Sequence, residues 1–343
     1  MACSMLSRRR LLQGSGGFLL ASGLLGATAA RAQGALIGLV HTQAAGDAGP
    51  VDSMIAKLEQ FAFENGLMPR AIHALDPATY ETFFTTLAEA GASVVVSTFN
   101  EVAEPIRAVA PNFPGTRFIQ LFGDPFEPTI PNMTTVSYDY YLGCYLSGIF
   151  AAHMSRSGKL GFIGGVAIPP IVADFNAFRA GALSVNPDIT ATAAFAGSFE
   201  DPAKGQEIAT QMFSDGIDFI QTDAAATDFG IIAAASEREG RLVSCLDPAQ
   251  FELAPRNLIS IVGLDFGESL YNEVVRATAP GWEAGHVSTG LGTGVIDFIR
   301  NPLFIEQGSA ELNAMAEAAM PQVDAARAAI LAGSLQVEFN TNL

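Results

Sequence analysis

The sequence predicts an α/β protein made of two doubly wound, parallel-sheet lobes joined by a multi-strand hinge. Short apolar runs alternate with helical stripes along almost the whole chain, which is typical of parallel sheets covered by helices. The same strand–helix unit recurs in both halves of the chain. At 343 residues the chain also exceeds the length at which one hydrophobic core stops growing, so we expect it to divide into two lobes.

Strands are predicted where short runs rich in Val, Ile and Phe lie between turn residues. These runs are 35–41, 93–99, 117–122, 133–138, 159–165, 189–195, 218–223, 241–246 and 258–262. Helices are predicted where apolar residues recur at helical spacing, as at Val51, Met54 and Leu58, or after a capped start such as Asp201-Pro202. The main helices cover 80–87, 102–109, 141–154, 202–216, 227–238, 269–277 and 309–332.

Residues 1–32 are predicted to be a twin-arginine export signal. The segment 7–12 reads Ser-Arg-Arg-Arg-Leu-Leu, a weakly apolar run follows, and Ala30-Arg31-Ala32 has the small-x-small pattern of a cleavage site. We therefore expect cleavage after Ala32 and a soluble periplasmic protein. No lipobox surrounds Cys3, so a lipoprotein is not expected.

We expect the chain to cross between the lobes near 157, 260 and 285. The first lobe then comprises 33–157 with a return segment at about 260–285, and the second comprises 158–259 with a tail at about 286–343. Repeated crossings make a hinge, and the cleft between hinged lobes is the natural place for a ligand.

The charge balance excludes several classes of partner. The net charge is −17, and removal of the four arginines of the leader takes it to −21. Such an acidic surface repels phosphate backbones, so nucleic acid is not an expected partner.

The two cysteines outside the leader, Cys144 and Cys245, lie in separate apolar patterns and are expected to be buried thiols. We expect a monomer.

No sequence motif indicates an enzyme, a metal site or a cofactor. The chain has no H-E-x-x-H, G-x-S-x-G, Walker A or C-x-x-C motif. The histidines stand at positions 41, 73, 153 and 286, without the spacing of metal ligands. We therefore expect no catalytic residues and no cofactor.

Candidate ligand residues follow the predicted strands, because ligands of open α/β sheets bind beyond the carboxyl ends of the strands. Aromatic rings beside carboxylates and amides suit a flat heterocycle whose edges form hydrogen bonds. The alternative is that some of these rings belong to the core and some acids cap helices. The candidates are Thr42, Gln43, Phe99, Asn100, Asp124, Asp223 and Asp247, together with Tyr141 at the start of a predicted helix.

The middle of the chain resembles a known family. The run Lys-Leu-Gly-Phe-Ile-Gly-Gly at 159–165 is followed by Phe175, by Phe-Arg-Ala-Gly at 178–181, by Asn-Pro-Asp at 186–188 and by Gly-Ser-Phe-Glu-Asp at 197–201. Upstream, Tyr-Leu-Ser-Gly at 145–148 leads into Ala151-Ala152. This order resembles the basic membrane protein (BMP) family of ABC-transporter substrate-binding proteins, from about Ala35 to Val337.

The resemblance implies the type I periplasmic-binding-protein fold and a role in ABC import, with a membrane permease as partner. Family members are similar in binding purine nucleosides, and some bind purine bases or flavins. By this resemblance Phe175 matches an aromatic residue that stacks on the base, and Asp247 matches an acid that holds the ribose. Phe266 adds a stacking face, as in members that look like purine-base binders.

Three segments depart from the family pattern. Thr-Gln-Ala-Ala-Gly-Asp at 42–47 replaces an acidic and Phe-Asn cluster, and Asp-Ala-Ala-Ala-Thr-Asp at 223–228 replaces a glycine-rich turn. The stretch 260–266 lacks the expected lysine. The first hypothesis is thus an exported binding protein for a purine base or nucleoside, and the second replaces the purine with a flavin or another heterocycle. The third is an exported nucleoside hydrolase using Asp47, Asp124, Asp223 and Asp247.

Overall fold

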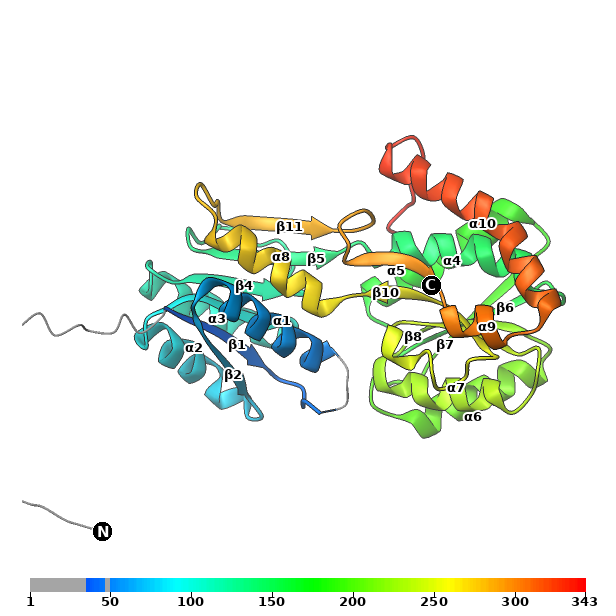
Figure 1. Ribbon diagram of the computed structural model, residues 1–343, viewed down its shortest axis with the longest axis horizontal. Coiled ribbons are helices and arrows are strands. Elements are labelled where there is room, and N and C mark those ends of the chain that lie inside the picture. The colour runs from blue at the N-terminus through cyan, green and yellow to red at the C-terminus, as the bar shows by residue number, and fades with distance from the viewer. Residues whose placement is uncertain (1–34, 47–49) are drawn as a thin grey trace, which may run out of the picture. The chain divides into compact units, whose positions relative to one another are not determined.

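Two six-stranded sheets, each covered by helices on both faces, form the framework of the molecule (Figure 1). The structure is a computed structural model that describes residues 35–46 and 50–343. The predicted export signal, 1–32, and Asp47 lie outside the described residues. Among the described residues, no helix is both long enough and apolar enough to cross a membrane.

The first sheet has the strand order β11-β5-β4-β3-β1-β2, and every neighbouring pair is parallel. Its strands are β1 (Leu36–His41), β2 (Met68–His73), β3 (Ala92–Thr98), β4 (Arg117–Leu121), β5 (Met133–Tyr138) and β11 (Gly285–Thr289). Because the strands run the same way, their carboxyl ends meet at one edge of the sheet.

Both faces of the first sheet are buried, which explains the apolar runs 36–40 in β1 and 94–96 in β3. Ile37 and Leu39 pack into the cluster that includes side chains of α1 (Pro50–Asn65) and α8 (Phe266–Thr278). Leu36 and Val40 point the other way, into the cluster of α2 (Tyr80–Glu89) and α3 (Ala103–Val109). Successive side chains of a strand point to opposite faces of the sheet, so β1 contributes to two separate apolar layers.

The second sheet has the order β12-β10-β9-β8-β6-β7. Its strands are β6 (Lys159–Gly164), β7 (Thr190–Phe195), β8 (Phe219–Asp223), β9 (Leu242–Cys245), β10 (Leu258–Leu264) and β12 (Ile296–Arg300). All pairs are parallel except β10 with β12, which are antiparallel. The helices packed around it are α4 (Tyr140–Met154), α5 (Pro169–Val185), α6 (Pro202–Ser214), α7 (Asp228–Ser236), α9 (Pro302–Gln307) and α10 (Ala310–Leu331).

The chain passes between the two sheets three times, after β5, after β10 and after β11. Hydrogen bonds tie the passing segments together. The Asp139 N–H donates to the Thr289 carbonyl at 2.8 Å, and the Asp265 N–H donates to the Val295 carbonyl at 2.8 Å. The third passing segment therefore begins at a bond to the first and ends at a bond to the second.

The element boundaries differ in part from those expected. Helix α4, expected with the first lobe, packs along α5 and α10 beside the second sheet. The lobe divisions near 157, 260 and 285 stay a prediction. Strands β2, β11 and β12 were not expected, because these edge strands are largely exposed on one or both faces and carry no continuous apolar run. Cys144 and Cys245 are both buried free cysteines, as expected.

Helices α4 and α5 approach each other closely because glycines occupy their contact. A Cβ placed on Gly148 would lie 2.0 Å from the Phe178 carbonyl oxygen, and one on Gly181 would lie 2.1 Å from the Tyr145 carbonyl oxygen. Since α5 carries Phe175, this contact also determines where that ring lies relative to α4. Both positions therefore require glycine for α4 and α5 to pack this closely.

The substitution Gly148→Ala should therefore destabilise the protein by about 1–3 kcal/mol, because the added methyl group forces the two helices apart. Gly115→Ala is the control, since nothing lies within 4 Å of a Cβ at that position. Urea unfolding of both variants measures the difference. A Gly148 variant as stable as the Gly115 variant would contradict the close packing of α4 and α5.

Candidate functional site

Four aromatic side chains meet at the carboxyl edge of the first sheet, and we call them the aromatic group: Phe99, Phe122, Tyr138 and Phe266. Phe122 is its centre. The Phe122 ring stacks on Phe99 with centroids 5.3 Å apart, stacks on Phe266 at 5.2 Å, and contacts Tyr138 at 4.4 Å. Three of the rings remain partly exposed and only Phe266 is buried. The group thus presents aromatic surface at the edge where ligands of this type of sheet bind.

Two members of the aromatic group have strained backbones. Phe99 has a φ of 71° and Phe122 a φ of 55°, in the left-handed region that bulky residues rarely adopt. Each such conformation costs on the order of 1–3 kcal/mol and persists only where the surroundings enforce it. Here the Phe99 N–H donates to the Leu121 carbonyl at 3.0 Å, and the Gln120 amide donates to the Phe99 carbonyl at 3.2 Å. The two strained residues thus lie at the ends of neighbouring strands, β3 and β4.

The other two rings reach the aromatic group from different directions. Tyr138 ends β5, and its hydroxyl forms a 2.7 Å hydrogen bond with the Ser269 hydroxyl on α8. Phe266 opens α8 directly after the chain returns from the second sheet. The Asp265 side chain caps this helix by accepting from the Glu268 N–H at 2.8 Å. The return segment therefore contributes a ring to a surface that β3, β4 and β5 begin.

Three buried carboxyl groups lie near the carboxyl edge of the second sheet, and we call them the acid group: Asp174, Asp223 and Asp228. Asp223 ends β8, Asp174 lies on α5 and Asp228 begins α7. Asp174 and Asp223 form a side-chain hydrogen bond, which requires one of them to carry a proton. Asp228 makes no hydrogen bond of normal geometry, although Thr222, Ala224 and Gln250 lie near it.

Burial raises the pKa of all three carboxyl groups. It raises the pKa of Asp223 to about 6, while the hydrogen bond from Asp174 opposes the shift. For Asp174, burial and then the charge of Asp223 raise the pKa well above its usual value. The pKa of Asp228 is also raised well above its usual value, by burial first. When the Asp174–Asp223 pair holds one proton, it offers both a donor and an acceptor.

Phe175 lies beside the acid group on α5. Its ring contacts Phe162 with centroids 5.7 Å apart, and the Arg179 guanidinium lies 5.3 Å from its centroid. Phe175 is buried, with 6% of the residue exposed. One member of the acid pair, Asp174, and the aromatic residue Phe175 thus occupy consecutive positions of one helix.

Four further predicted residues lie in loops of the first sheet. The Thr42 hydroxyl donates to Glu101 at 2.7 Å, and Gln43 is exposed, with its backbone carbonyl 2.7 Å from the His41 ring. Asn100 is exposed at the start of a short 3-10 helix, and Asp124 is exposed after β4. The role of these four residues as ligand contacts stays a prediction.

Two predicted residues of the second sheet already have structural contacts. Asp247 caps the 3-10 helix Pro248–Gln250, where its side chain accepts from the Ala249 N–H at 2.8 Å. The Tyr141 ring contacts Phe339 edge-on, with centroids 5.3 Å apart. The capping of Asp247 is the alternative that the sequence left open, and neither contact tests ligand binding.

Four residues that the structure brings to these surfaces are absent from the candidate list, although the strand-end rule also pointed to Phe122: Phe122, Tyr138, Asp174 and Asp228. Phe122 and Tyr138 close predicted strands, so the rule that selected Phe99 also applies to them. Asp174 had a different signal, since it is the one acidic residue of its helix and lies next to Phe175. Asp228 closes the segment that departs from the family's glycine-rich turn.

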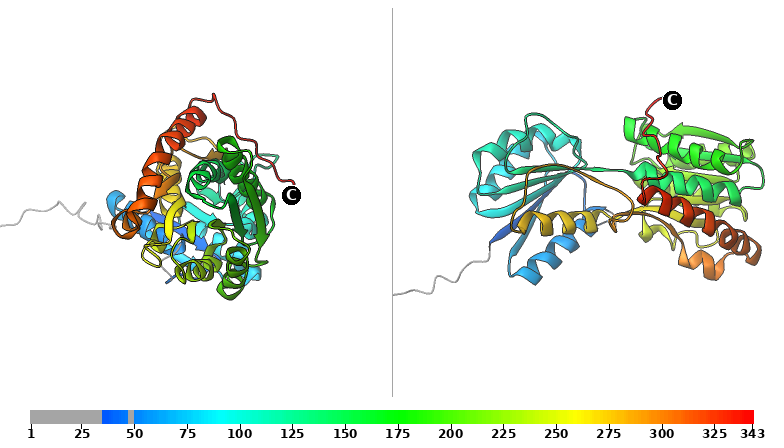
Figure 2. Two further views of the ribbon diagram at one scale, coloured as in Figure 1. Left: turned by 90° about the vertical axis from the view of Figure 1, so that its right-hand side faces the viewer. Right: turned by 90° about the horizontal axis from the view of Figure 1, so that it is seen from above.

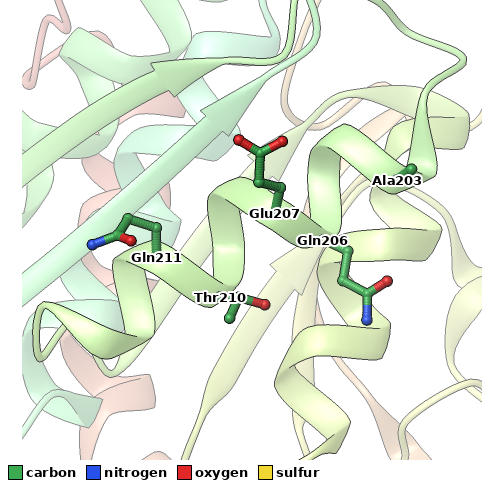
Figure 3. Close-up of a pocket in the computed structure, with 5 residues that line it drawn as sticks. All are labelled: Ala203, Gln206, Glu207, Thr210 and Gln211. Atoms are coloured by element: carbon green, nitrogen blue, oxygen red, sulfur yellow. The ribbon is translucent and has the colours of Figure 1, made fainter.

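A separate shallow pocket of about 460 Å³ lies on α6 and involves none of these residues. Its lining comes from one helix: Ala203, Gln206, Glu207, Thr210 and Gln211. Figure 3 shows that the Glu207 and Gln206 side chains point away from each other and do not converge. Within residues 35–46 and 50–343, no cluster of His, Cys, Asp or Glu could hold a metal ion.

The raised pKa of Asp223 predicts how stability depends on pH. The folded state keeps this proton up to about pH 6, whereas the unfolded chain loses it near 3.8, so the stabilisation present below pH 3.8 is lost as pH rises through 6. Asp223→Asn should therefore raise the free energy of unfolding at pH 8 by roughly 2–3 kcal/mol, with a gain near zero at pH 4. Chemical unfolding at both pH values measures this.

The matched control is Asp188→Asn, since Asp188 is exposed. It should change the free energy of unfolding by less than about 0.5 kcal/mol at either pH. An equal effect of Asp223→Asn at pH 4 and pH 8 would show that the carboxyl group does not titrate as its burial requires.

Comparisons with known proteins agree with this architecture. A solute-binding protein of an ABC transporter system from Aeropyrum pernix K1 superposes with a TM-score of 0.75 at 18% identity, covering 90% of this chain and 94% of that one. Basic membrane protein A1 of Borrelia garinii subsp. bavariensis is 34% identical over 60% of this chain, and the match spans 62% of the relative's length. A protein of Brucella abortus named as purine-binding is 28% identical over 64% of this chain and 61% of its own.

The family model described as "ABC transporter substrate-binding protein PnrA-like" matches residues 44–340. The superposition and the strand order confirm the type I periplasmic-binding-protein fold. This family consists of solute-binding proteins and not of enzymes, as the absence of catalytic motifs led us to expect. The chain belongs to the Bmp, or PnrA-like, family of ABC transporter substrate-binding proteins.

Proposed function

We propose that this protein captures a purine nucleobase or nucleoside outside the cytoplasm and delivers it to the permease of an ABC importer. The observation that carries the proposal is the strained Phe122 at the centre of the aromatic group. A flat ring stacks on such a surface, and the acid group supplies hydrogen bonds to the edge of the ring. The purine-binding name of the Brucella abortus relative supports the same class of ligand.

The charges of the site favour a neutral or cationic ligand. The acid group is buried, so its carboxylates are poorly solvated. A further negative charge beside them would raise the free-energy cost of keeping them ionised. A phosphate group would add that charge, so nucleotides are disfavoured. Purine N–H groups instead donate to Asp223, while a ring nitrogen accepts from the protonated partner. The set of donors and acceptors thus matches the edge of a nucleobase.

Binding would be coupled to closure of the hinge. In this proposal the aromatic group covers one face of the base, Phe175 approaches the other face, and the three passing segments bend. Ligand contacts with both sheets favour the closed state by the difference in affinity between the two states. The permease would then distinguish the closed, loaded protein from the open one.

The predicted leader supports export. A twin-arginine signal at 1–32 would place the folded protein in the periplasm, where importers collect their solutes. We propose that the mature protein acts as a monomer.

A flavin is the competing ligand, since its ring system also stacks on aromatic side chains. Binding of riboflavin in place of purines would favour this alternative.

Calorimetric titration with adenine, guanine, hypoxanthine, xanthine and their nucleosides tests the proposal. At least one purine should bind. Phe122→Ala and Phe175→Ala should each weaken that binding by about 5- to 100-fold, because one stacking contact contributes roughly 1–3 kcal/mol. Riboflavin serves as the comparison ligand.

Phe63→Ala is the matched control, because Phe63 is 90% exposed on α1. It should leave the dissociation constant unchanged. No purine binding by the unmodified protein would overturn the ligand class. Unchanged affinity in both the Phe122 and Phe175 variants would place the site elsewhere.

A further inference from the structure

The chain that follows α10 does not leave the second sheet but folds back over its helices. Gly333, with a φ of 70°, reverses the direction, and the N–H groups of Ser334 and Leu335 donate to the Ala329 carbonyl at 3.0 and 3.1 Å. Leu335 and Val337 then pack against the hydrophobic core. Figure 2 shows this segment as a thin red line leaving α10. We call residues 334–342 the C-terminal strap.

One side chain of α5 holds the far end of the C-terminal strap. The Asn176 Nδ2 donates to the Asn340 carbonyl at 2.7 Å and to the Asn342 carbonyl at 2.8 Å. Both amide hydrogens are therefore used, and Asn176 is only 6% exposed. The Phe339 ring contacts Tyr141 beside this anchor. Beyond Leu335 the strap has no helix or strand hydrogen bonds, so few contacts hold it in place.

The same asparagine connects the C-terminal strap to the proposed ligand-stacking ring. Its Oδ1 accepts from the Arg179 Nη2 at 3.1 Å, and the Arg179 guanidinium lies 5.3 Å from the centroid of Phe175. Asn176 also follows Phe175 directly along α5. A continuous set of contacts thus runs from the strap through Asn176 and Arg179 to the ring.

We propose that Asn176 is a positioning residue, and that the docked C-terminal strap orients Phe175 for ligand binding. This inference rests on the proposed role of Phe175 in stacking. Because so few contacts hold the strap, it can detach while the sheet stays folded. Linkage then requires reciprocity: if docking tightens ligand binding by some factor, bound ligand must stabilise docking by the same factor.

The substitution Asn176→Asp removes the hydrogen bonds to the strap and keeps the one from Arg179. The carboxylate has nearly the same shape and still accepts from Arg179, but it cannot donate to Asn340 and Asn342 and places negative charge against their carbonyl oxygens. Hydrogen exchange of the Asn342 N–H, which donates to the Asn340 Oδ1 at 3.0 Å beside the anchor, should accelerate about tenfold or more. With 4-fluorophenylalanine at position 175, the fluorine resonance should move in the same variant, without any ligand.

A chain shortened after Ser334 provides the second arm. It should show the same displaced fluorine resonance and should bind the tightest of adenine, guanine and hypoxanthine about five- to tenfold more weakly, mainly through faster dissociation. Asn176→Asp in the shortened chain should add nothing further, because the interaction it breaks is already gone. Gln336→Ala, an exposed position of the strap, is the control and should leave all readouts unchanged.

The outcomes separate this inference from the proposed function. If none of the three purines binds but the fluorine resonance moves in both variants, the strap orients Phe175 and the ligand assignment fails. An unmoved resonance in both variants would overturn the inference. So would an equal loss of affinity from Asn176→Asp in the full and the shortened chain.

Discussion

Parallel alignment of the strands is the constraint on which the proposed site depends. In the first sheet every neighbouring pair is parallel, so the residues that follow β3, β4 and β5 must emerge at one edge. Phe99, Phe122 and Tyr138 meet there for that reason, although tens of residues separate them in the chain. The long helical connections that parallel strands require bury the rest of the sheet and leave this edge accessible.

The two strand edges present different chemistry. The first sheet contributes aromatic rings, and its strained backbone at Phe99 and Phe122 is held by hydrogen bonds to neighbouring strand residues. The second sheet contributes carboxyl groups whose charged form is disfavoured by burial. Both features reduce stability in the absence of a ligand. Such retained costs are typical of binding sites, where the same groups gain contacts when a ligand arrives.

Helix α5 connects recognition to the rest of the second sheet. Its glycine contact with α4 sets its position, and its residues 174–176 carry in turn an acid, an aromatic ring and the anchor of the C-terminal strap. Each of these side chains depends on its neighbours for orientation. A small movement of α5 would therefore change several contacts together, which is the behaviour expected of a packed, bistable element and not of a flexible loop.

The sequence was enough to predict the α/β class, the recurrence of one unit in two sheets and the family, because apolar periodicity and motif order are local properties of the chain. It also indicated Phe99, Phe175, Asp223 and Phe266 through the strand-end rule and the family resemblance. It missed edge strands such as β11, whose exposed faces carry no apolar run.

Which strand ends meet depends on the tertiary structure. The sheet order places β11 beside β5, and the return through Asp265 brings Phe266 onto Phe122. The tertiary structure also brings Asp174 beside Asp223, which is 49 positions later in the chain. In the same way it places Asn340 within hydrogen-bond distance of Asn176. Contacts between residues this far apart depend on sheet order and helix packing, and no local pattern records them.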